Sequence, residues 1–161
     1  MPDGARSELG DLLHWVADAA SAFYDGLDRR PVFPDASLAE LRRALDVPLE
    51  DDGVAADVVV RELAAAADRG IVASAGGRYF GFVVGGSLPA ALAADWLTSA
   101  WDQNAGLYAM GPAAAVAEEV AGRWLLDVLG LPAGASFGFV TGAQMANASA
   151  LAAARHCVLE R

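Results

Sequence analysis

Residues 137–155, FGFVTGAQMANASALAAAR, decide the fold class that we predict for this chain. Phe137–Val140 is a short apolar run, which is consistent with a buried strand. Thr141–Gln144 is a turn of small residues, and from Met145 onward the pattern is strongly helical. The stretch therefore predicts a strand, a tight turn and a helix, a unit that normally buries its strand in a sheet of several strands.

The rest of the chain offers no other clear strand, and its last helix has no terminal glycine or proline. A sheet with a single strand is not a stable layer, so the pattern favours a piece of a larger α/β protein. The alternative is a complete helical protein with one atypical apolar run.

Six helical segments follow from periodicity and from start and stop residues. Ser7 is the expected cap of the first helix, Ser37 and Glu40 form a capping box, and Pro89 and Pro112 open two later helices. The expected ranges are about 7–27, 38–45, 55–69, 89–101, 112–129 and 145 onward. The first helix has an apolar stripe made of Leu9, Leu12, Leu13, Val16, Ala20 and Phe23.

The composition is that of a globular protein, with 55% apolar and 20% charged residues. The formal net charge of −10 opposes binding to nucleic-acid phosphates. No run reaches the roughly 18 apolar residues that a membrane-spanning helix needs, and the N-terminus does not read as a secretory signal. Cys157 is the single cysteine, so a reducing cytoplasm is the simplest compartment.

All 11 basic residues are arginine. The chain therefore has no lysine amine with which to form a Schiff base.

The turn at residues 141–144 is a candidate anion site. Small residues before a helix expose backbone N–H groups beside the positive end of the helix dipole, which suits a phosphate. The Thr141 hydroxyl and the Gln144 amide add hydrogen-bonding groups, and Gly142 and Ala143 offer no bulk. The turn is not a Walker motif, and many strand–helix turns hold nothing.

Three blocks together resemble the group II pyridoxal-phosphate-dependent decarboxylases, a family that includes glutamate and aromatic amino-acid decarboxylases. They are RYFGFVVGGSLPAALAADWLTSAWDQNAG (78–106), GPAAAVAEEVAGRWLLDVLGLP (111–132) and FVTGAQMANASALAAAR (139–155). The resemblance implies the N-terminal part of an α/β domain of the aspartate-aminotransferase type (PLP fold type I). This part is mostly helical, with a short strand before the last helix. Residues 1–75 are then an N-terminal helical segment that wraps a partner subunit, and 76–161 begin the cofactor domain.

The resemblance also implies roles for individual residues. The residues matching the turn that holds the cofactor phosphate are Thr141, Gly142, Ala143, Gln144 and Asn147. The residues matching the substrate pocket and its entrance are Phe80, Phe82, Val83, Val84, Gln103 and Asn104. Two positions depart from the family pattern: Gly111 replaces a serine, and Gly76-Gly77 replaces a His-Pro pair.

No catalytic residue and no metal ligand can be assigned in this chain. The family's lysine, its aspartate beside the pyridine nitrogen and its stacking histidine are expected further along. His14 and His156 are interpreted as surface or interface residues, and Cys157 as a small apolar residue. The four tryptophans fall in predicted helices, where core packing is the default.

The resemblance implies pyridoxal-phosphate-dependent decarboxylation of an L-amino acid by a cytoplasmic homodimer. This chain would supply the phosphate turn and part of the pocket, and would be inactive alone. The alternatives are a non-catalytic helical dimerisation module and an inactive truncation product. The identity of the amino acid is not readable, because the residues that select it lie mostly outside this segment.

Overall fold

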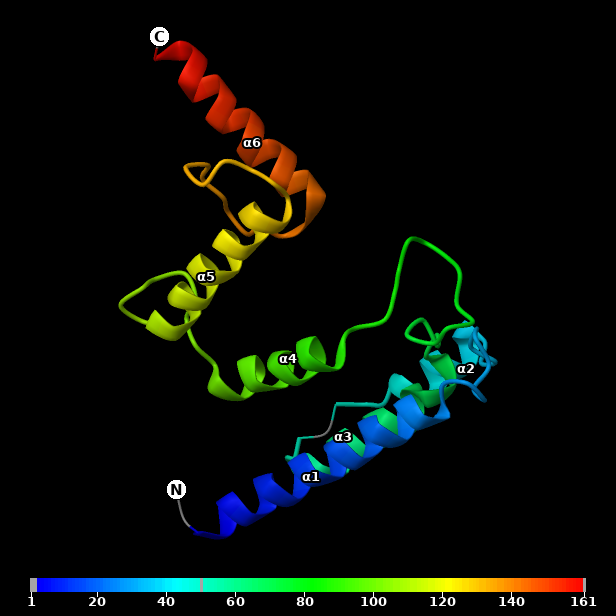
Figure 1. Cartoon of the computed structure of the whole chain (residues 1–161). Helices are drawn as coiled ribbons and strands as arrows, with labels where there is room; N and C mark the ends of the chain where they lie inside the picture. Colours follow the sequence, from blue (N-terminus) through cyan, green and yellow to red (C-terminus); the bar gives the residue numbers. More distant parts are fainter. Residues whose placement is uncertain (1–2, 50, 161) are drawn as a thin grey trace. The chain divides into compact units, whose positions relative to one another are not determined.

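The computed structural model describes residues 3–49 and 51–160. Within these ranges the chain forms six α-helices and a short 3-10 helix, η1 (Figure 1). Their bounds are α1 Asp3–Gly26, α2 Leu38–Leu45, α3 Ala56–Ala67, η1 Asp68–Gly70, α4 Pro89–Trp101, α5 Pro112–Val128 and α6 Gly142–Leu159. None of the described helices is long and apolar enough to cross a bilayer.

Most helix boundaries follow local signals that the sequence carries. The capping box of α2 is confirmed: the Ser37 hydroxyl accepts from the Glu40 N–H at 3.2 Å, and a Glu40 carboxylate oxygen accepts from the Ser37 N–H at 2.7 Å. Pro89 and Pro112 begin α4 and α5 as expected. Gly130, with φ of 65°, follows the end of α5 in the left-handed conformation that glycine adopts readily.

Three boundaries differ from the prediction, one of them the start of α6, which lies at Gly142 and not at Met145. Helix α1 begins at Asp3, so Ser7 lies inside the helix and not at its cap. Serine is tolerated within a helix when helix-forming residues flank it, so it does not have to mark the helix start. The helix expected over 55–69 is α3 followed by η1, in which the last turn tightens before Gly70.

The short strand predicted before the last helix is not formed. Residues 137–140 have no regular secondary structure, and the described residues contain no strand at all. Phe137 and Phe139 are 43% and 52% exposed. A strand needs a neighbouring strand to accept its backbone hydrogen bonds, and the described part of this chain offers none. The aspartate-aminotransferase-type fold stays a prediction.

The chain divides into two compact units, Met1–Leu92 and Ala93–Arg161, which are described separately below. The boundary falls inside α4. The division predicted at 75/76 separates segments by function, which the two compact units do not test, so it stays a prediction.

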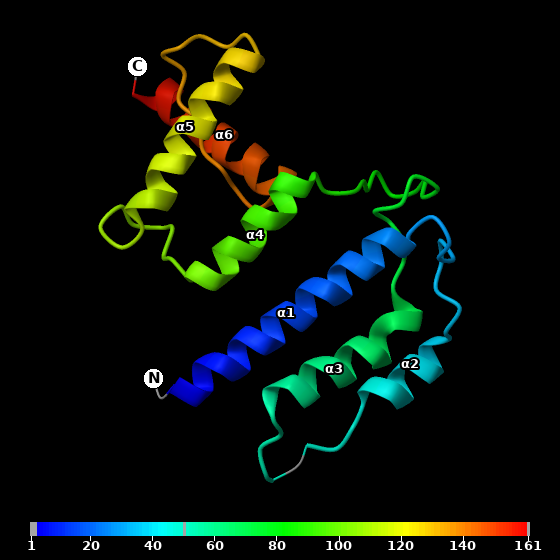
Figure 2. The same cartoon turned by 60° about the horizontal axis from the view of Figure 1, so that its bottom comes forward.

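In the first unit, α3 lies beside α1 (Figure 2). The Arg61 guanidinium of α3 stacks over the Trp15 ring of α1, 4.4 Å from its centroid. Helix α2 packs against α3. The predicted stripe of α1 is partly covered: Leu12, Val16, Ala20 and Phe23 are half-buried. Leu9 and Leu13 stay exposed.

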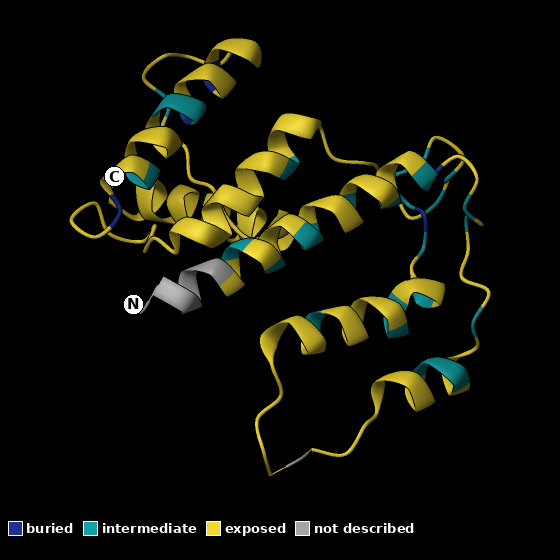
Figure 3. Ribbon diagram, turned by 90° about the horizontal axis from the view of Figure 1, so that it is seen from below, coloured by how far each residue is buried: buried dark blue, intermediate teal, exposed yellow. Residues whose placement is uncertain are grey.

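The hydrophobic core is small. Among the described residues, only Leu27, Ala73 and Leu126 are buried apolar residues, and Figure 3 shows most of the ribbon as exposed. The core placement expected for the tryptophans is wrong for three of them, since Trp96, Trp101 and Trp124 are 39%, 62% and 69% exposed. Apolar helices of this kind are normally covered by further protein.

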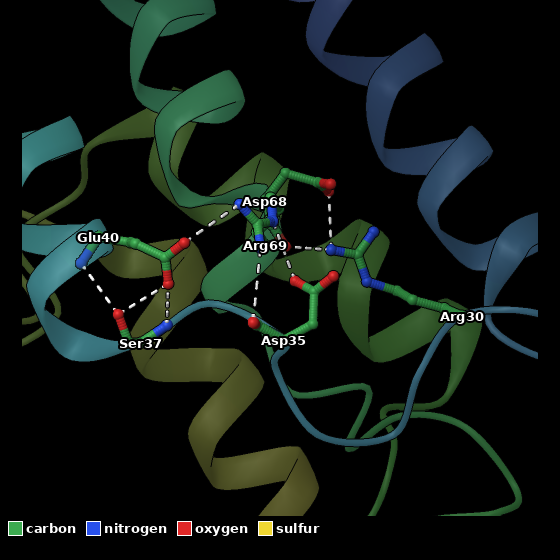
Figure 4. A network of polar contacts seen from close by, with 6 residues as sticks. All are labelled: Arg30, Asp35, Ser37, Glu40, Asp68 and Arg69. Atoms are coloured by element: carbon green, nitrogen blue, oxygen red, sulfur yellow. Dashed lines mark hydrogen bonds and ion pairs between the residues drawn. The ribbon is translucent and has the colours of Figure 1, made fainter.

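Arginines make the long-range side-chain hydrogen bonds of the first unit, and Figure 4 shows the polar contacts of Arg30 and Arg69. Arg30 of the α1–α2 connection pairs with Asp68 of η1 at 2.8 Å. Arg69 pairs with Asp35 at 3.1 Å and with Glu40 at 3.9 Å. These contacts attach the α1–α2 connection and the start of α2 to η1.

Candidate functional site

The predicted phosphate turn is the start of α6. Thr141 is the residue before the first helical turn, and its side chain makes no capping hydrogen bond. Gly142 has φ of 85°, which an L side chain adopts only with strain. Its N–H donates to the Val140 carbonyl at 3.0 Å. The glycine thus turns the chain from the irregular segment into the helix.

The amides that follow are available to a ligand. The first N–H groups of a helix have no acceptor within the helix itself, and those of Ala143 and Gln144 have none among the described residues. No atom lies within 4 Å of the point where a Cβ on Gly142 would be, and the first turn of α6 carries no acidic residue. This arrangement fits an anion such as a phosphate.

The five residues predicted to hold the cofactor lie together, because they are close in sequence. Asn147 follows Ala143 by four residues, so the two share one face of α6. All five are exposed. The hydrogen bond that shapes this turn is local, since the Gly142 N–H donates to the carbonyl of Val140 two residues earlier.

The two polar residues predicted near the pocket entrance form local hydrogen bonds. The Gln103 amide donates to the Trp101 carbonyl at 2.8 Å, and the Asn104 side-chain oxygen accepts from the Gly106 N–H at 3.0 Å. Their side chains therefore stabilise the loop that follows α4. Asp102, with φ of 46°, turns the chain there.

The predicted substrate-lining residues form an exposed turn. Phe80, Phe82 and Val83 are 91%, 89% and 108% exposed. Phe82 and Val83 have φ of 51° and 56°, and the Val84 N–H donates to the Gly81 carbonyl at 3.1 Å. Aromatic and β-branched residues favour extended backbone, but this segment forms a turn.

Two candidate groups thus belong to different units. The turn at 80–84 is in the first unit, whereas Gln103, Asn104 and the start of α6 are in the second.

The departure from the family pattern at Gly111 has a steric basis. A Cβ on Gly111 would lie 2.5 Å from the Asn104 carbonyl oxygen, closer than any side chain tolerates. The residue is buried and precedes Pro112. The close return of the 102–111 loop onto its own start therefore requires glycine at position 111.

The remaining candidates do not assemble into a reactive site. His156 faces Glu160 one turn along α6 at 3.2 Å, and Cys157 is exposed. A small cavity in the first unit contains none of the predicted site residues. It is lined by Arg30, Pro31, Phe33, Pro34, Asp35, Asp68, Arg69 and Ile71. Its arginines are paired with its own aspartates.

The sequence is similar to that of an amino-acid decarboxylase. The relative is tryptophan decarboxylase 1 from Oryza sativa subsp. japonica, which is 28% identical over 125 residues, or 78% of this chain. The chain spans 24% of the length of that relative. No family model matches the chain, and no solved structure matches it.

Proposed function

We propose that this chain contributes the cofactor-phosphate turn and part of the substrate pocket to a pyridoxal-phosphate-dependent carboxy-lyase acting on an L-amino acid. The observation that carries the proposal is the similarity to a tryptophan decarboxylase over 78% of the chain. The three ordered blocks support it, as does a helix start with free amides at Ala143 and Gln144. The proposal extends to a homodimer of the aspartate-aminotransferase type.

The residues of this chain would bind and orient. The N–H groups of Ala143 and Gln144 donate to phosphate oxygens, the Thr141 hydroxyl and the Gln144 amide add donors, and the α6 dipole favours the negative charge. Bound pyridoxal phosphate supplies an electron sink for cleavage at the substrate α-carbon. The chain has no lysine, so it cannot itself attach the cofactor through a lysine amine.

A phosphate titration of the 161-residue chain tests the turn. Inorganic phosphate and pyridoxal phosphate should shift the amide NMR signals of Ala143 and Gln144, and Ala143→Glu should weaken binding by about tenfold or more through repulsion and lost access. Ala153→Glu, on the same exposed helix, is the matched control and should bind as the unmodified chain does. Equal binding by the two variants would refute the phosphate assignment.

The missing lysine gives a second test. Borohydride reduction of the chain mixed with pyridoxal phosphate should leave no cofactor attached to a side chain, and the mixture should release no CO₂ from an L-amino acid. A reduced adduct on any side chain would overturn this expectation.

The second candidate is a non-catalytic helical interaction module. The exposure of apolar residues on α5 and α6, including Trp124 at 69% and Leu151 at 71%, favours a role in which other protein covers these helices. Phosphate binding at Ala143 and Gln144 separates the two candidates, because an interaction module has no need of a free helix start.

A further inference from the structure

The turn at 80–84 cannot orient its own side chains. Phe80, Phe82 and Val83 are almost fully exposed, and two consecutive bulky residues adopt positive φ. A left-handed conformation at such residues is strained. The direction in which these side chains point must therefore be set where the turn joins the rest of the first unit.

Arg78 makes that junction. Its guanidinium donates to the Leu27 carbonyl at 3.1 Å and to the Arg30 carbonyl, which lie 51 and 48 residues earlier in the chain. Both carbonyls belong to the segment that follows the end of α1, where backbone oxygens lack helical partners. One planar guanidinium satisfies both, a geometry that the compact ammonium group of lysine matches less well.

Neighbouring contacts align the same two segments. The Ala73 N–H donates to the Val32 carbonyl at 3.0 Å, and the rings of Phe33 and Tyr79 lie 6.3 Å apart. Leu27 and Ala73 are the buried apolar residues of the first unit's described part. Arg78 lies between this small cluster and the turn at 80–84 in the sequence, and its hydrogen bonds attach that part of the chain to the segment after α1.

We infer that Arg78 is a positioning residue: by holding the carbonyls of Leu27 and Arg30 it sets the direction in which Phe80 and Phe82 face the substrate. The inference rests on the proposed function for the substrate-facing role of the turn. The hydrogen bonds themselves do not depend on it. The hydrogen bonds of the Arg78 guanidinium go to backbone carbonyls and not to a predicted substrate-binding residue, so Arg78 acts through the backbone.

Fluorine NMR of the 161-residue chain with 4-fluorophenylalanine at its phenylalanines tests the inference. The Phe80 and Phe82 signals, assigned with F80L and F82L, should move toward the position of an unstructured phenylalanine in Arg78→Met. The signals of Phe137 and Phe139, in the second unit, should stay in place. Exchange of the Ala73 and Val84 amides should accelerate roughly tenfold, as expected for loss of hydrogen bonds from a charged donor.

Two further variants make the result decisive. Arg78→Lys keeps a charged donor and should restore part of the fluorine shift, whereas Arg123→Met, at an exposed position of α5, should change neither signal. If Arg78→Met loses its helical circular dichroism signal, the test rests on Arg78→Lys alone. An intermediate fluorine shift in that variant then supports the inference.

Unchanged Phe80 and Phe82 signals in both Arg78 variants would overturn it. Phosphate-induced shifts at Ala143 and Gln144 are measured on the same samples. Their absence in the unmodified chain counts against the proposed function alone, because the fluorine signals report on Arg78 without any ligand.

Discussion

The ring of Phe137 lies directly on Gly122 of α5, so that a Cβ built on the glycine would meet ring atoms at 2.1 Å. Gly122 is buried, and so is Leu126 one turn further along the same helix. Phe137 also packs edge-on against Phe139, with ring centroids 6.1 Å apart. This contact attaches the irregular segment before α6 to α5, and thereby locates the start of α6 within the second unit.

Gly122→Ala should therefore destabilise the chain. Alanine normally gains up to about 1 kcal/mol over glycine inside a helix, but displacing a packed aromatic ring costs roughly 1–3 kcal/mol, so the net free energy of unfolding should fall. Gly10→Ala in α1, where no atom lies within 4 Å of the new Cβ, is the control and should raise it. Urea denaturation measures both, and a gain in Gly122→Ala would contradict the contact.

Replacing Gly111 by serine should also destabilise the chain. Serine before a helix usually contributes about 1 kcal/mol through its cap, but here its Cβ would meet the Asn104 carbonyl oxygen at 2.5 Å. The steric cost of roughly 1–3 kcal/mol should outweigh the cap. Exchange of the Gly106 and Gly111 amides, which are bonded within the loop, should accelerate. Gly85→Ser, at an open position, should leave these amides unchanged.

The capping box of α2 predicts a pH dependence. Hydrogen bonds from the Ser37 side chain and then its backbone lower the pKa of Glu40 from its usual 4.5; desolvation opposes this shift, and the charge of Arg69 makes the smallest contribution. Because the folded-state pKa is depressed, the stabilisation is present above the unfolded-state pKa and is lost as the pH falls through the folded-state value.

Ser37→Ala should accordingly raise the pKa of Glu40 toward 4.5, as measured by carboxyl carbon NMR during an acid titration. Ser149→Ala, on exposed α6, should leave the Glu40 titration unchanged. If the pKa of Glu40 is the same in Ser37→Ala as in the unmodified chain, the Ser37 hydroxyl is not the main cause of the lowered pKa.

The stacking of Arg61 over Trp15 predicts a coupling between the two side chains. A double-mutant cycle with Arg61→Met and Trp15→Leu should give an interaction energy of about 0.5–1 kcal/mol, since Arg61 is partly exposed. The same cycle with Trp124→Leu, in the second unit, should be additive. Additivity in the Arg61–Trp15 cycle would mean that the cation–π contact contributes nothing to stability.

The helical parts of the fold were predictable where one short window holds the whole signal. The hydroxyl of Ser37 and the carboxylate of Glu40 are three residues apart, and Pro112 acts on the helix that it begins. The start of α1 was misplaced, because Ser7 is acceptable both at a cap and within a helix. The strand at 137–140 was predicted from its apolar character, but a strand exists only with a partner that this window does not contain.

The candidate site divides in the same way. The helix start at Gly142–Gln144 follows from small residues ahead of a helical pattern, whereas the exposure and positive φ of Phe82 and Val83 contradict the extended form that their side chains favour. Nothing in the local sequence around Arg78 indicates that its acceptors are the carbonyls of Leu27 and Arg30.

The sequence by itself thus determined most helix boundaries, the capping box of α2 and the small-residue start of α6, because each depends on residues within about four positions of one another. The absence of lysine follows from the composition alone. Only the tertiary structure decided that Arg78 holds the end of α1, that Gly122 makes room for Phe137 and that Gly111 cannot be serine. These contacts join distant segments or close a loop, and their geometry depends on the path of the chain between them.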